Sequence, residues 1–411
     1  MMKKKIIVAI ADGLGDRPNR ELGNLTPLQY ATTPHLDFLA AKGSTGLMDP
    51  IAPGITVGTD MGHIVLFGHD STKYPGRGPI EAAGVGLDLI EGDIAFRCNF
   101  ATYDGSVIID RRAGRIRKGT EDLAKALNNM QIDDVVFKFK EATEHRAVLV
   151  MRGEGLSAQV SDSDPKAPND GKPYNEVYPL DDTPEAKKTA DILNKFLQKA
   201  YCQLKYHPVN IDRVAQGNLA ANFIITRGAG RMTQIPHLGD ELGFSCSVIA
   251  GEDTVLGVAR LSGYTAIQHK NFTGNVDTDV ALKAKLALRE LETNDIVFVH
   301  MKATDVKGHD NDPKGKAVAI EKFDEMVGYI LPHLPQDAIV ALCADHSTPC
   351  EKGEHSGEPV PVVMSGAGIL ADSVQTYDEE ACGKGRLNRL TGHQFIWSLL
   401  DYLEVVPKQG N

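Results

Sequence analysis

Aspartate and histidine residues recur in three short stretches in the second half of the chain. These stretches contain Asp305 and His309, then Asp345 and His346, and finally His355. Carboxylate oxygens and neutral imidazole nitrogens bind borderline divalent cations in mixed oxygen and nitrogen sites. Asp305 and His309 are four residues apart, so one helical turn would direct both side chains toward one ion. Each pattern alone is more typical of a turn or a helix cap, but together they predict a metal site.

A hydroxyl group, that of Thr59, follows Gly58 and precedes a run of residues with the spacing of an amphipathic helix, 60–67. Free N–H groups and the helix dipole favour an anion at such an N-terminus, for example a phosphoryl group on the threonine oxygen. Considered alone, a threonine in this position is more often only the helix cap. Its interpretation as a nucleophile therefore depends on the metal ligands elsewhere in the chain.

Parallel strands are expected to position these groups. Residues 5–10 form a short β-branched run that ends in a Gly-rich loop beginning at Asp12, which is typical of a central strand. Similar runs at 296–300 and 338–344 directly precede two of the Asp- and His-bearing stretches. Open α/β sheets form their sites at the carboxyl ends of strands, so Asp12 joins the predicted site, although Asp-Gly is also common in turns.

Strand and helix patterns alternate through the rest of the second half, which predicts an α/β fold with a mostly parallel sheet flanked by helices. The predicted helices of the chain include 28–41, 120–129, 183–204, 280–292, 317–331 and 392–403, and further strands are expected at 222–226, 246–250 and 360–364. Residues 80–182 instead contain short alternating runs joined by turn residues. We therefore predict a smaller α+β domain at 80–182, inserted into a core domain formed by 1–79 and 183–411.

Composition limits the classes of partner. The chain has 411 residues and a net charge of −11, which argues against binding to nucleic acid or an anionic membrane and favours a small-molecule partner. Asp12 interrupts the apolar run near the N-terminus, so this run is expected to be a buried strand rather than a signal peptide or membrane span. Six cysteines without CxxC spacing suit reduced thiols and a cytoplasmic location. An oligomer is compatible with this composition.

The order of the motifs resembles the alkaline phosphatase superfamily of two-metal phosphotransferases. The motifs are Asp-Gly-Leu-Gly-Asp at 12–16, Gly-Thr-Asp-Met-Gly-His at 58–63, Asp-Val-Lys-Gly-His at 305–309 and Asp-His-Ser-Thr-Pro at 345–349, followed by His355. Within the superfamily the chain resembles the archaeal-type, cofactor-independent (2,3-bisphosphoglycerate-independent) phosphoglycerate mutases. The stretches that narrow the resemblance to this family are 74–79, 110–115, 144–147 and 226–230, and the resemblance extends over nearly the whole chain.

The resemblance implies an alkaline-phosphatase-like core with two divalent metal ions, Mn²⁺, Mg²⁺ or Zn²⁺, and no requirement for 2,3-bisphosphoglycerate. One ion would be held by Asp305, His309 and His355. The other would be held by Asp12, Asp345, His346 and the oxygen of Thr59, which is implied to be the nucleophile. This position is commonly serine in these mutases, so Thr59 is a departure whose extra methyl group bears on rate and substrate range.

The implied activity is the interconversion of 3-phosphoglycerate and 2-phosphoglycerate through a phospho-Thr59 intermediate, in glycolysis and gluconeogenesis. Glycerate must stay bound and reorient, which requires a lid that excludes water, and the inserted domain is the natural lid. Planar guanidinium groups suit the carboxylate and phosphate of this substrate. The substrate-binding candidates are Arg97, Arg111, Arg112, Arg115, His145, Arg146 and Arg227. A group must also move a proton between the two hydroxyls, and Asp110 is the candidate, followed by Asp162 and His145.

Two other functions fit parts of this pattern. A metal-dependent phosphatase or other phosphohydrolase would transfer the phosphoryl group to water, but it does not need an arginine-rich insertion. A binding protein without catalytic activity would use the same fold, but every implied metal position carries a competent ligand. The sequence therefore favours the mutase.

Overall fold

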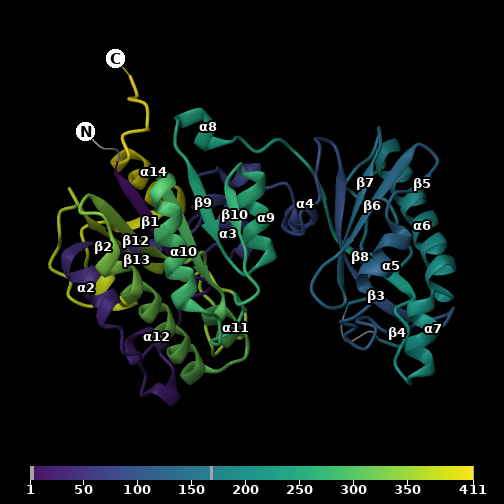
Figure 1. Cartoon of the computed structure of the whole chain (residues 1–411), viewed down its shortest axis with the longest axis horizontal. Coiled ribbons are helices and arrows are strands. Elements are labelled where there is room, and N and C mark those ends of the chain that lie inside the picture. The colour runs from purple at the N-terminus through teal and green to yellow at the C-terminus, as the bar shows by residue number, and fades with distance from the viewer. Residues whose placement is uncertain (1–3, 167–169, 411) are drawn as a thin grey trace. The chain divides into compact units, whose positions relative to one another are not determined.

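The computed structural model describes residues 4–166 and 170–410 and divides into two compact units. The first unit comprises Met1–Tyr74 and Ile235–Asn411, and the second comprises Pro75–Gln234 (Figure 1). Each unit is built around its own sheet. Among the described residues no helix combines the length and the apolar character that a membrane span requires.

The sheet of the first unit has the strand order β10-β9-β11-β1-β12-β13-β2-β14. In chain order these strands are β1 (Lys5–Ala11), β2 (Gly43–Asp49), β9 (Cys246–Ile249), β10 (Thr265–Ile267), β11 (Ile296–Met301), β12 (Ala338–Cys343), β13 (Val360–Gly366) and β14 (Asn388–Thr391). Every neighbouring pair is parallel except the two that involve β13. The central strands β1, β11 and β12 are buried apart from Lys5, as expected for a sheet covered by helices.

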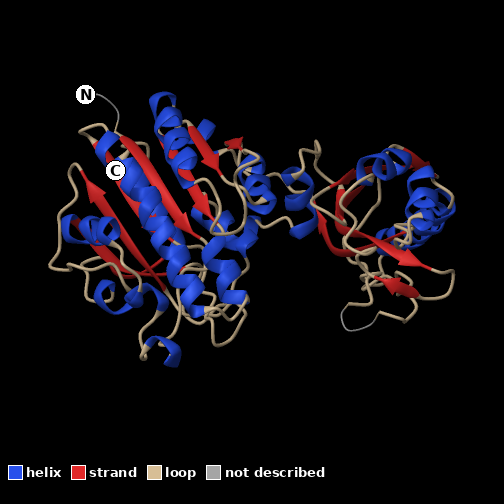
Figure 2. Ribbon diagram, turned by 60° about the horizontal axis from the view of Figure 1, so that its bottom comes forward, coloured by secondary structure: helices blue, strands red, loops and turns tan. Residues whose placement is uncertain are grey.

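Helices of the first unit pack against this sheet (Figure 2). They are α1 (Pro27–Tyr30), α2 (Pro34–Lys42), α3 (Thr59–Leu66), α8 (Leu238–Leu242), α9 (Asp253–Leu261), α10 (Val280–Thr293), α11 (Ala303–His309), α12 (Pro313–Ile330), α13 (Glu379–Cys382) and α14 (Gly392–Tyr402). Short 3-10 helices lie at Arg20–Leu22, Ser71–Lys73 and Leu331–His333. Helix α12 contacts α2 and α10 in one layer, and α3 contacts α9 and α14 in a second. The predicted α/β class is confirmed.

One predicted helix is wrong. The sequence pattern predicts a single helix over 28–41, whereas the structure has two, α1 and α2, separated at Ala31–Thr33. Proline disfavours helical backbone in the preceding residue, and Pro34 begins the second helix with Thr33 as its N-cap. The apolar residues keep a helical spacing across this interruption, so the spacing alone does not reveal the break that Pro34 marks.

The second unit contains an antiparallel sheet in the order β4-β3-β7-β6-β5, with β8 paired to β3. Its strands are β3 (Ile94–Tyr103), β4 (Ile108–Asp110), β5 (Met130–Ile132), β6 (Val135–Glu141), β7 (Arg146–Arg152) and β8 (Phe223–Arg231), and its helices are α4 (Arg77–Gly84), α5 (Thr120–Leu127), α6 (Pro184–Lys205) and α7 (Pro208–Ala215). Alternate residues of β3, from Ile94 to Phe100, enter the core that α5 and α6 cover. The opposite face carries Ala95, which packs with α4.

The unit boundaries differ from the predicted ones. The predicted core included 183–411, but α6 and β8 lie in the second unit, and so does α4, which straddles the predicted boundary at 79. The apolar side of α6, for example Phe196, packs on the β6 residue Phe137 with the rings stacked at 4.4 Å. Strand β8 completes the second sheet by pairing with β3. A long amphipathic helix has the same pattern whichever sheet it covers, so these partners decide its domain.

A buried lysine in the first unit gives a prediction about stability. Lys283 on α10 is 1% exposed, its Nζ donates to the carbonyl of His300 at 2.5 Å, and burial lowers its pKa to about 7. Between pH 7 and about 10.4 the unfolded state binds one more proton than the folded state at this group, so its contribution to stability rises with pH. Lys283→Met removes the cost of burying the amine but also loses the hydrogen bond to His300. The net expected effect is an increase of about 2 kcal/mol in the free energy of unfolding at pH 7.

The measurement is urea unfolding of both proteins at pH 7, 8, 9 and 10. The advantage of Lys283→Met should shrink by about 1.4 kcal/mol per pH unit over this range. A constant difference between variant and wild type would show that Lys283 keeps its ordinary pKa in the folded protein.

Candidate functional site

The predicted metal ligands meet at the carboxyl ends of three neighbouring strands. Strands β11, β1 and β12 are adjacent in the sheet. Asp12 directly follows β1, Asp345 and His346 follow β12, and Asp305 lies on α11 just beyond β11. Because parallel strands end at the same edge of a sheet, these side chains lie together. The structure brings all seven predicted metal-binding residues into two adjoining groups within the first unit.

The first group consists of Asp305, His309 and His355. The two imidazoles face each other with their Nε2 atoms 3.2 Å apart, and each Nε2 is 3.4 Å from Oδ1 of Asp305. The Nδ1 of His309 lies 2.9 Å from the carbonyl of Gly353, and that of His355 lies 2.8 Å from the carbonyl of Val57. A carbonyl only accepts, so both rings carry a proton on Nδ1, and in the neutral rings Nε2 is a lone pair.

The second group consists of Asp12, Asp345 and His346, with Thr59 beside it. The Nε2 of His346 is 3.3 Å from Asp12 Oδ1, from Asp345 Oδ2 and from Thr59 Oγ1. Thr348 donates its hydroxyl proton to Asp305, so the Nδ1 of His346, 3.1 Å from this hydroxyl, must donate to it. This fixes the proton of His346 on Nδ1 and leaves Nε2 as an acceptor among oxygens.

Both groups fit divalent cations. Two facing imidazole lone pairs at 3.2 Å repel unless a cation or a proton lies between them. In the second group Asp345 Oδ2 is buried without a hydrogen-bond partner among the described residues. Backbone or hydroxyl groups already fix the outer nitrogen of each histidine, which is how proteins orient metal-binding imidazoles. The donor sets, two imidazoles with a carboxylate and two carboxylates with an imidazole, suit Zn²⁺ or Mn²⁺.

Thr59 is the first residue of α3 and follows the N-cap Gly58, so it begins the helix rather than capping it. Its Oγ1 lies 3.1 Å from Nζ of Lys302 as well as 3.3 Å from His346. The expectation that this oxygen lies against the metal-binding groups agrees with these distances. Because Gly58 is the N-cap and Thr59 Oγ1 contacts Lys302 and His346 instead of the helix, the simpler interpretation of Thr59 as a cap does not hold.

Lys302 is a site residue that the sequence reasoning missed. Its Nζ lies 3.1 Å from both carboxylate oxygens of Asp12 and 2.8 Å from Oδ2 of Asp305. Burial alone would lower the pKa of Lys302, but the carboxylates of Asp12 and Asp305 raise it well above its ordinary value. Burial alone would also raise the pKa of Asp12, but Lys302, His300 and His346 hold it far below its usual range. The lysine is therefore a fixed cation beside the threonine oxygen.

Two buried histidines, His63 and His300, contact the predicted metal ligands. The sequence patterns did not single out His300. His300 Nε2 lies 2.8 Å from Asp12 Oδ2, and burial lowers its pKa to about 4, so this ring is a neutral donor. His63 Nδ1 lies 2.7 Å from the carbonyl of Thr59 and 3.4 Å from Asp345 Oδ2. His63 thus links the turn of α3 that carries Thr59 to Asp345, one of the predicted metal ligands. His63 lies within a predicted motif and His300 ends a predicted strand. Their roles depend on distances between residues far apart in the sequence.

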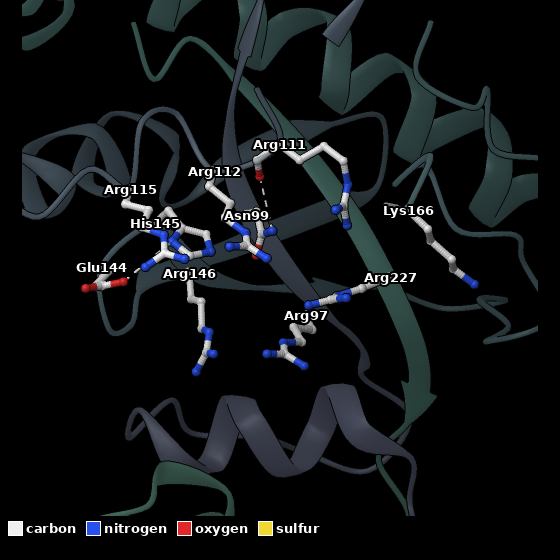
Figure 3. Close-up of a pocket in the computed structure, with 10 residues that line it drawn as sticks. All are labelled: Arg97, Asn99, Arg111, Arg112, Arg115, Glu144, His145, Arg146, Lys166 and Arg227. Carbon is white, nitrogen blue, oxygen red and sulfur yellow. Dashed lines mark hydrogen bonds and ion pairs between the residues drawn. The ribbon is translucent and has the colours of Figure 1, made fainter. Parts of the chain in front are cut away.

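The second unit contains a basic cavity of about 490 Å³ (Figure 3). Its lining residues are Arg97, Asn99, Arg111, Arg112, Arg115, Glu144, His145, Arg146, Lys166 and Arg227. All seven predicted substrate-binding residues are therefore among them. Arg97 is on the face of β3 opposite the hydrophobic core and is the cross-strand partner of Arg227 on β8. Like charges in this position are unfavourable without an anion nearby, and the carboxylates of Glu81 and Asp164 supply negative charge beside them.

The arginines of the cavity fall into two sets. In the first, Arg111 holds the buried Asp164 through two bonds of 2.6 and 2.7 Å. Arg227 lies 3.9 Å from the same carboxylate, and Arg97 lies 3.3 Å from Glu81. Burial lowers the pKa of Arg97 to about 10, because its partner only partly compensates the loss of water. In the second set, Arg112, Arg115 and Arg146 form no ion pair with a described carboxylate. These three guanidinium groups are free to bind an external anion.

The three acid/base candidates have different positions. Asp110 is not among the lining residues, and its carboxylate accepts from the N–H of Arg112 at 2.6 Å in a turn. Asp162 accepts from the N–H of Gly228 and pairs with Lys166, also outside the set of lining residues. His145 lines the cavity, and its Nδ1 has no hydrogen-bond partner among the described residues. Burial and the neighbouring Arg146 and Arg112 lower its pKa to about 4.

Fold and site together define an α/β enzyme whose carboxylate, imidazole and hydroxyl groups gather at the ends of central parallel strands. Comparison with known proteins narrows this class. Residues 40–210 match the family model described as 2,3-bisphosphoglycerate-independent phosphoglycerate mutase. Proteins of that name from Methanopyrus kandleri and Thermococcus kodakarensis are 45% and 44% identical over 418 and 414 residues. The alignments cover 100% of this chain and 99% and 100% of those proteins.

The chain belongs to the family of 2,3-bisphosphoglycerate-independent phosphoglycerate mutases, which are isomerases. Solved structures agree with this assignment. A protein from Pyrococcus horikoshii superposes with a TM-score of 0.86 at 36% identity, covering 100% of both chains. A cofactor-independent phosphoglycerate mutase from Thermoplasma acidophilum gives a TM-score of 0.73 at 34% identity, covering 97% of this chain and 100% of that one. The resemblance inferred from the motifs is thereby confirmed.

Proposed function

We propose that the chain interconverts 3-phosphoglycerate and 2-phosphoglycerate through a phosphoryl group carried transiently on Thr59. The observation that carries this proposal is the position of Thr59 Oγ1, 3.1 Å from the Lys302 ammonium and 3.3 Å from His346 in a group suited to a divalent cation. The family's relatives carry the corresponding name. The basic cavity contains three guanidinium groups without an ion-pair partner among the described residues, and it suits an acid that bears a carboxylate and a phosphate.

Asp305, His309 and His355 would hold one divalent ion, and Asp12, Asp345, His346 and the Thr59 oxygen the other. Bound ions would polarise the phosphate and favour the ionised form of the Thr59 hydroxyl. Lys302 places a positive charge where the threonine oxygen and the incoming phosphate carry negative charge. His63 holds the carbonyl of Thr59 and thereby orients the first turn of α3.

The reaction consists of two balanced transfers. In the first, Thr59 Oγ1 forms a bond to phosphorus, the bond to the 3-oxygen breaks, and the hydroxyl proton passes to the departing oxygen to give glycerate. In the second, the 2-hydroxyl takes the phosphoryl group back and its proton returns to Thr59. The arginines of the cavity retain the glycerate by its carboxylate between the two steps.

The test is incubation of the metal-loaded protein with 3-phosphoglycerate, with 2-phosphoglycerate and free phosphate measured in parallel. Formation of 2-phosphoglycerate without a supply of 2,3-bisphosphoglycerate is expected. Release of free phosphate without 2-phosphoglycerate would replace the mutase by a metal-dependent phosphohydrolase. Mass mapping of acid-quenched protein should find the phosphoryl group on the peptide that contains Thr59.

A further prediction concerns the proton transfer. We infer that His145 rather than Asp110 accepts the proton of the attacking hydroxyl, because His145 lines the cavity and its lowered pKa of about 4 keeps the ring neutral at physiological pH. His145→Gln should lower kcat roughly 10²-fold, the usual loss for one general base. Asp110→Asn is the matched control and should change kcat less than about fivefold, because its carboxylate serves a turn. Steady-state kinetics on both variants provide the test. If Asp110 is the base, Asp110→Asn would lower kcat more than His145→Gln.

A further inference from the structure

The turn that carries Arg112 and Arg115 has an unusual backbone. Ala113, Gly114 and Arg115 have φ values of 46°, 64° and 54°, so three successive residues are left-handed. Only glycine adopts this conformation readily, and two of the three are not glycine. Such backbone persists only where the surrounding structure holds it in place. Contacts with the surrounding residues must therefore hold this turn.

Arg213, near the end of α7, supplies such a contact. One terminal nitrogen of its guanidinium donates to the carbonyl of Ala113 at 3.0 Å, and its Nε donates to the carbonyl of Leu219 at 2.9 Å. Leu219 also packs beside the turn, with its Cβ 3.8 Å from the position that a side chain at Gly114 would occupy. The planar fork of an arginine thus joins the left-handed turn to the segment that follows α7.

Apart from these two carbonyls, the guanidinium of Arg213 has no hydrogen-bond or ion-pair partner among the described residues. No described carboxylate forms an ion pair with it, and it is absent from the lining of the basic cavity. Burial lowers its pKa, so this guanidinium is held at a cost in solvation. An apolar residue would pack there at less cost, but it could not join two carbonyls. The contact with Ala113 is therefore the feature that an arginine specifically supplies.

We propose that Arg213 is a positioning residue for substrate binding, because it holds the turn that directs Arg112 and Arg115 into the cavity. Neither of these arginines has a carboxylate partner among the described residues, so their direction is set by their backbone rather than by an ion pair. This inference rests on the proposed function, in which the cavity binds the phosphorylated acid.

The first experiment is kinetic and uses the metal-loaded full chain. Arg213→Met should raise KM for 3-phosphoglycerate about tenfold while kcat changes less than about twofold, because the turn lies outside the reacting groups. Arg213→Lys should restore only part of the affinity, since an ammonium cannot span both carbonyls. Arg231→Met is the matched control. Arg231 also lies in the second unit and donates to a backbone carbonyl, that of Leu156, but it does not line the cavity, so the KM of this variant should stay unchanged.

The second experiment distinguishes positioning from a general loss of stability. The dissociation constant of 3-phosphoglycerate is measured by calorimetry for Arg115→Ala in the wild-type and in the Arg213→Met background. The loss caused by Arg115→Ala should be at least about threefold smaller in the second background, because Arg115 is already misplaced there. Equal losses in both backgrounds, or an unchanged constant in Arg213→Met, would overturn the proposal.

The same measurements separate this inference from the proposed function. Wild-type protein that binds 3-phosphoglycerate without converting it would overturn the mutase activity alone, and the coupling between Arg213 and Arg115 would still be decided by binding. Wild-type protein that does not bind 3-phosphoglycerate would overturn the substrate assignment and the inference together.

Discussion

Thr59→Ala should lower kcat for the interconversion of the phosphoglycerates by about 10⁴-fold or more, the scale of loss when a covalent nucleophile is removed. The variant removes the oxygen that Lys302 contacts at 3.1 Å and His346 at 3.3 Å. The fold should persist, because Thr59 makes no cap hydrogen bond to α3 and alanine favours helix. Rates are measured with 3-phosphoglycerate at saturating Mn²⁺, and the phosphoryl group should be absent from quenched variant protein.

Two further variants make this result specific. Thr59→Ser keeps the hydroxyl and loses only a methyl group, so kcat should stay within about tenfold of wild type. Thr45→Ala removes another buried threonine of the first unit, one that contacts Asp372, and should leave kcat unchanged while lowering stability. Substantial activity in Thr59→Ala would show that phosphoryl transfer uses another nucleophile or passes directly between the two hydroxyls.

Asp345→Asn should lower kcat by about 10³-fold and reduce the number of bound divalent ions by one, because an amide is a poor substitute for a buried carboxylate ligand. Asp345 is fully buried, one of its oxygens accepts from the N–H of Gly13 at 3.1 Å, and the other has no hydrogen-bond partner among the described residues. The second oxygen is the one expected to bind the ion. Elemental analysis of dialysed protein measures the stoichiometry independently of activity.

Asp49→Asn is the matched control for the loss of a buried carboxylate. Asp49 is 2% exposed at the end of β2 and binds Arg389 through two bonds of 2.7 and 2.8 Å. This change should lower stability without changing the ion content or kcat. Loss of an ion in Asp49→Asn, or full ion content in Asp345→Asn, would contradict the assignment of the second metal-binding group.

The candidate metal-binding groups could be predicted from sequence because three of the ligands, Asp12, Asp345 and His346, come just after strands with a recognisable pattern. The edge of a parallel sheet brings such residues together whatever the details of packing, so Asp12, Asp345 and His346 needed only the strand order. Lys302 was missed although it lies only three residues before Asp305. An ammonium is not a metal ligand, and its role depends on a distance to Thr59 that no sequence spacing contains.

The second unit was harder to predict for a different reason. The cavity arginines were identified from motifs, but Asp110 was preferred over His145 because it adjoins Arg111 in the sequence. In the structure the Asp110 carboxylate binds the backbone of its own turn, a local hydrogen bond typical of aspartate. The sequence pattern does not predict the boundaries of the two units either, because amphipathic helices such as α6 do not specify which sheet they cover. These features depend on contacts between distant residues.

The order of the site residues along the chain determines when the protein can acquire its function during synthesis. Gly13 and Asp345, joined by one hydrogen bond, are 332 residues apart, and the last ligand, His355, follows them. The second unit, Pro75–Gln234, is one continuous segment whose internal contacts can all form before the last six strands of the first sheet, β9 to β14, leave the ribosome. The nascent protein therefore cannot assemble either candidate group of metal ligands until more than four-fifths of the chain exists. Contact order in this fold thus delays catalytic competence until translation is almost complete.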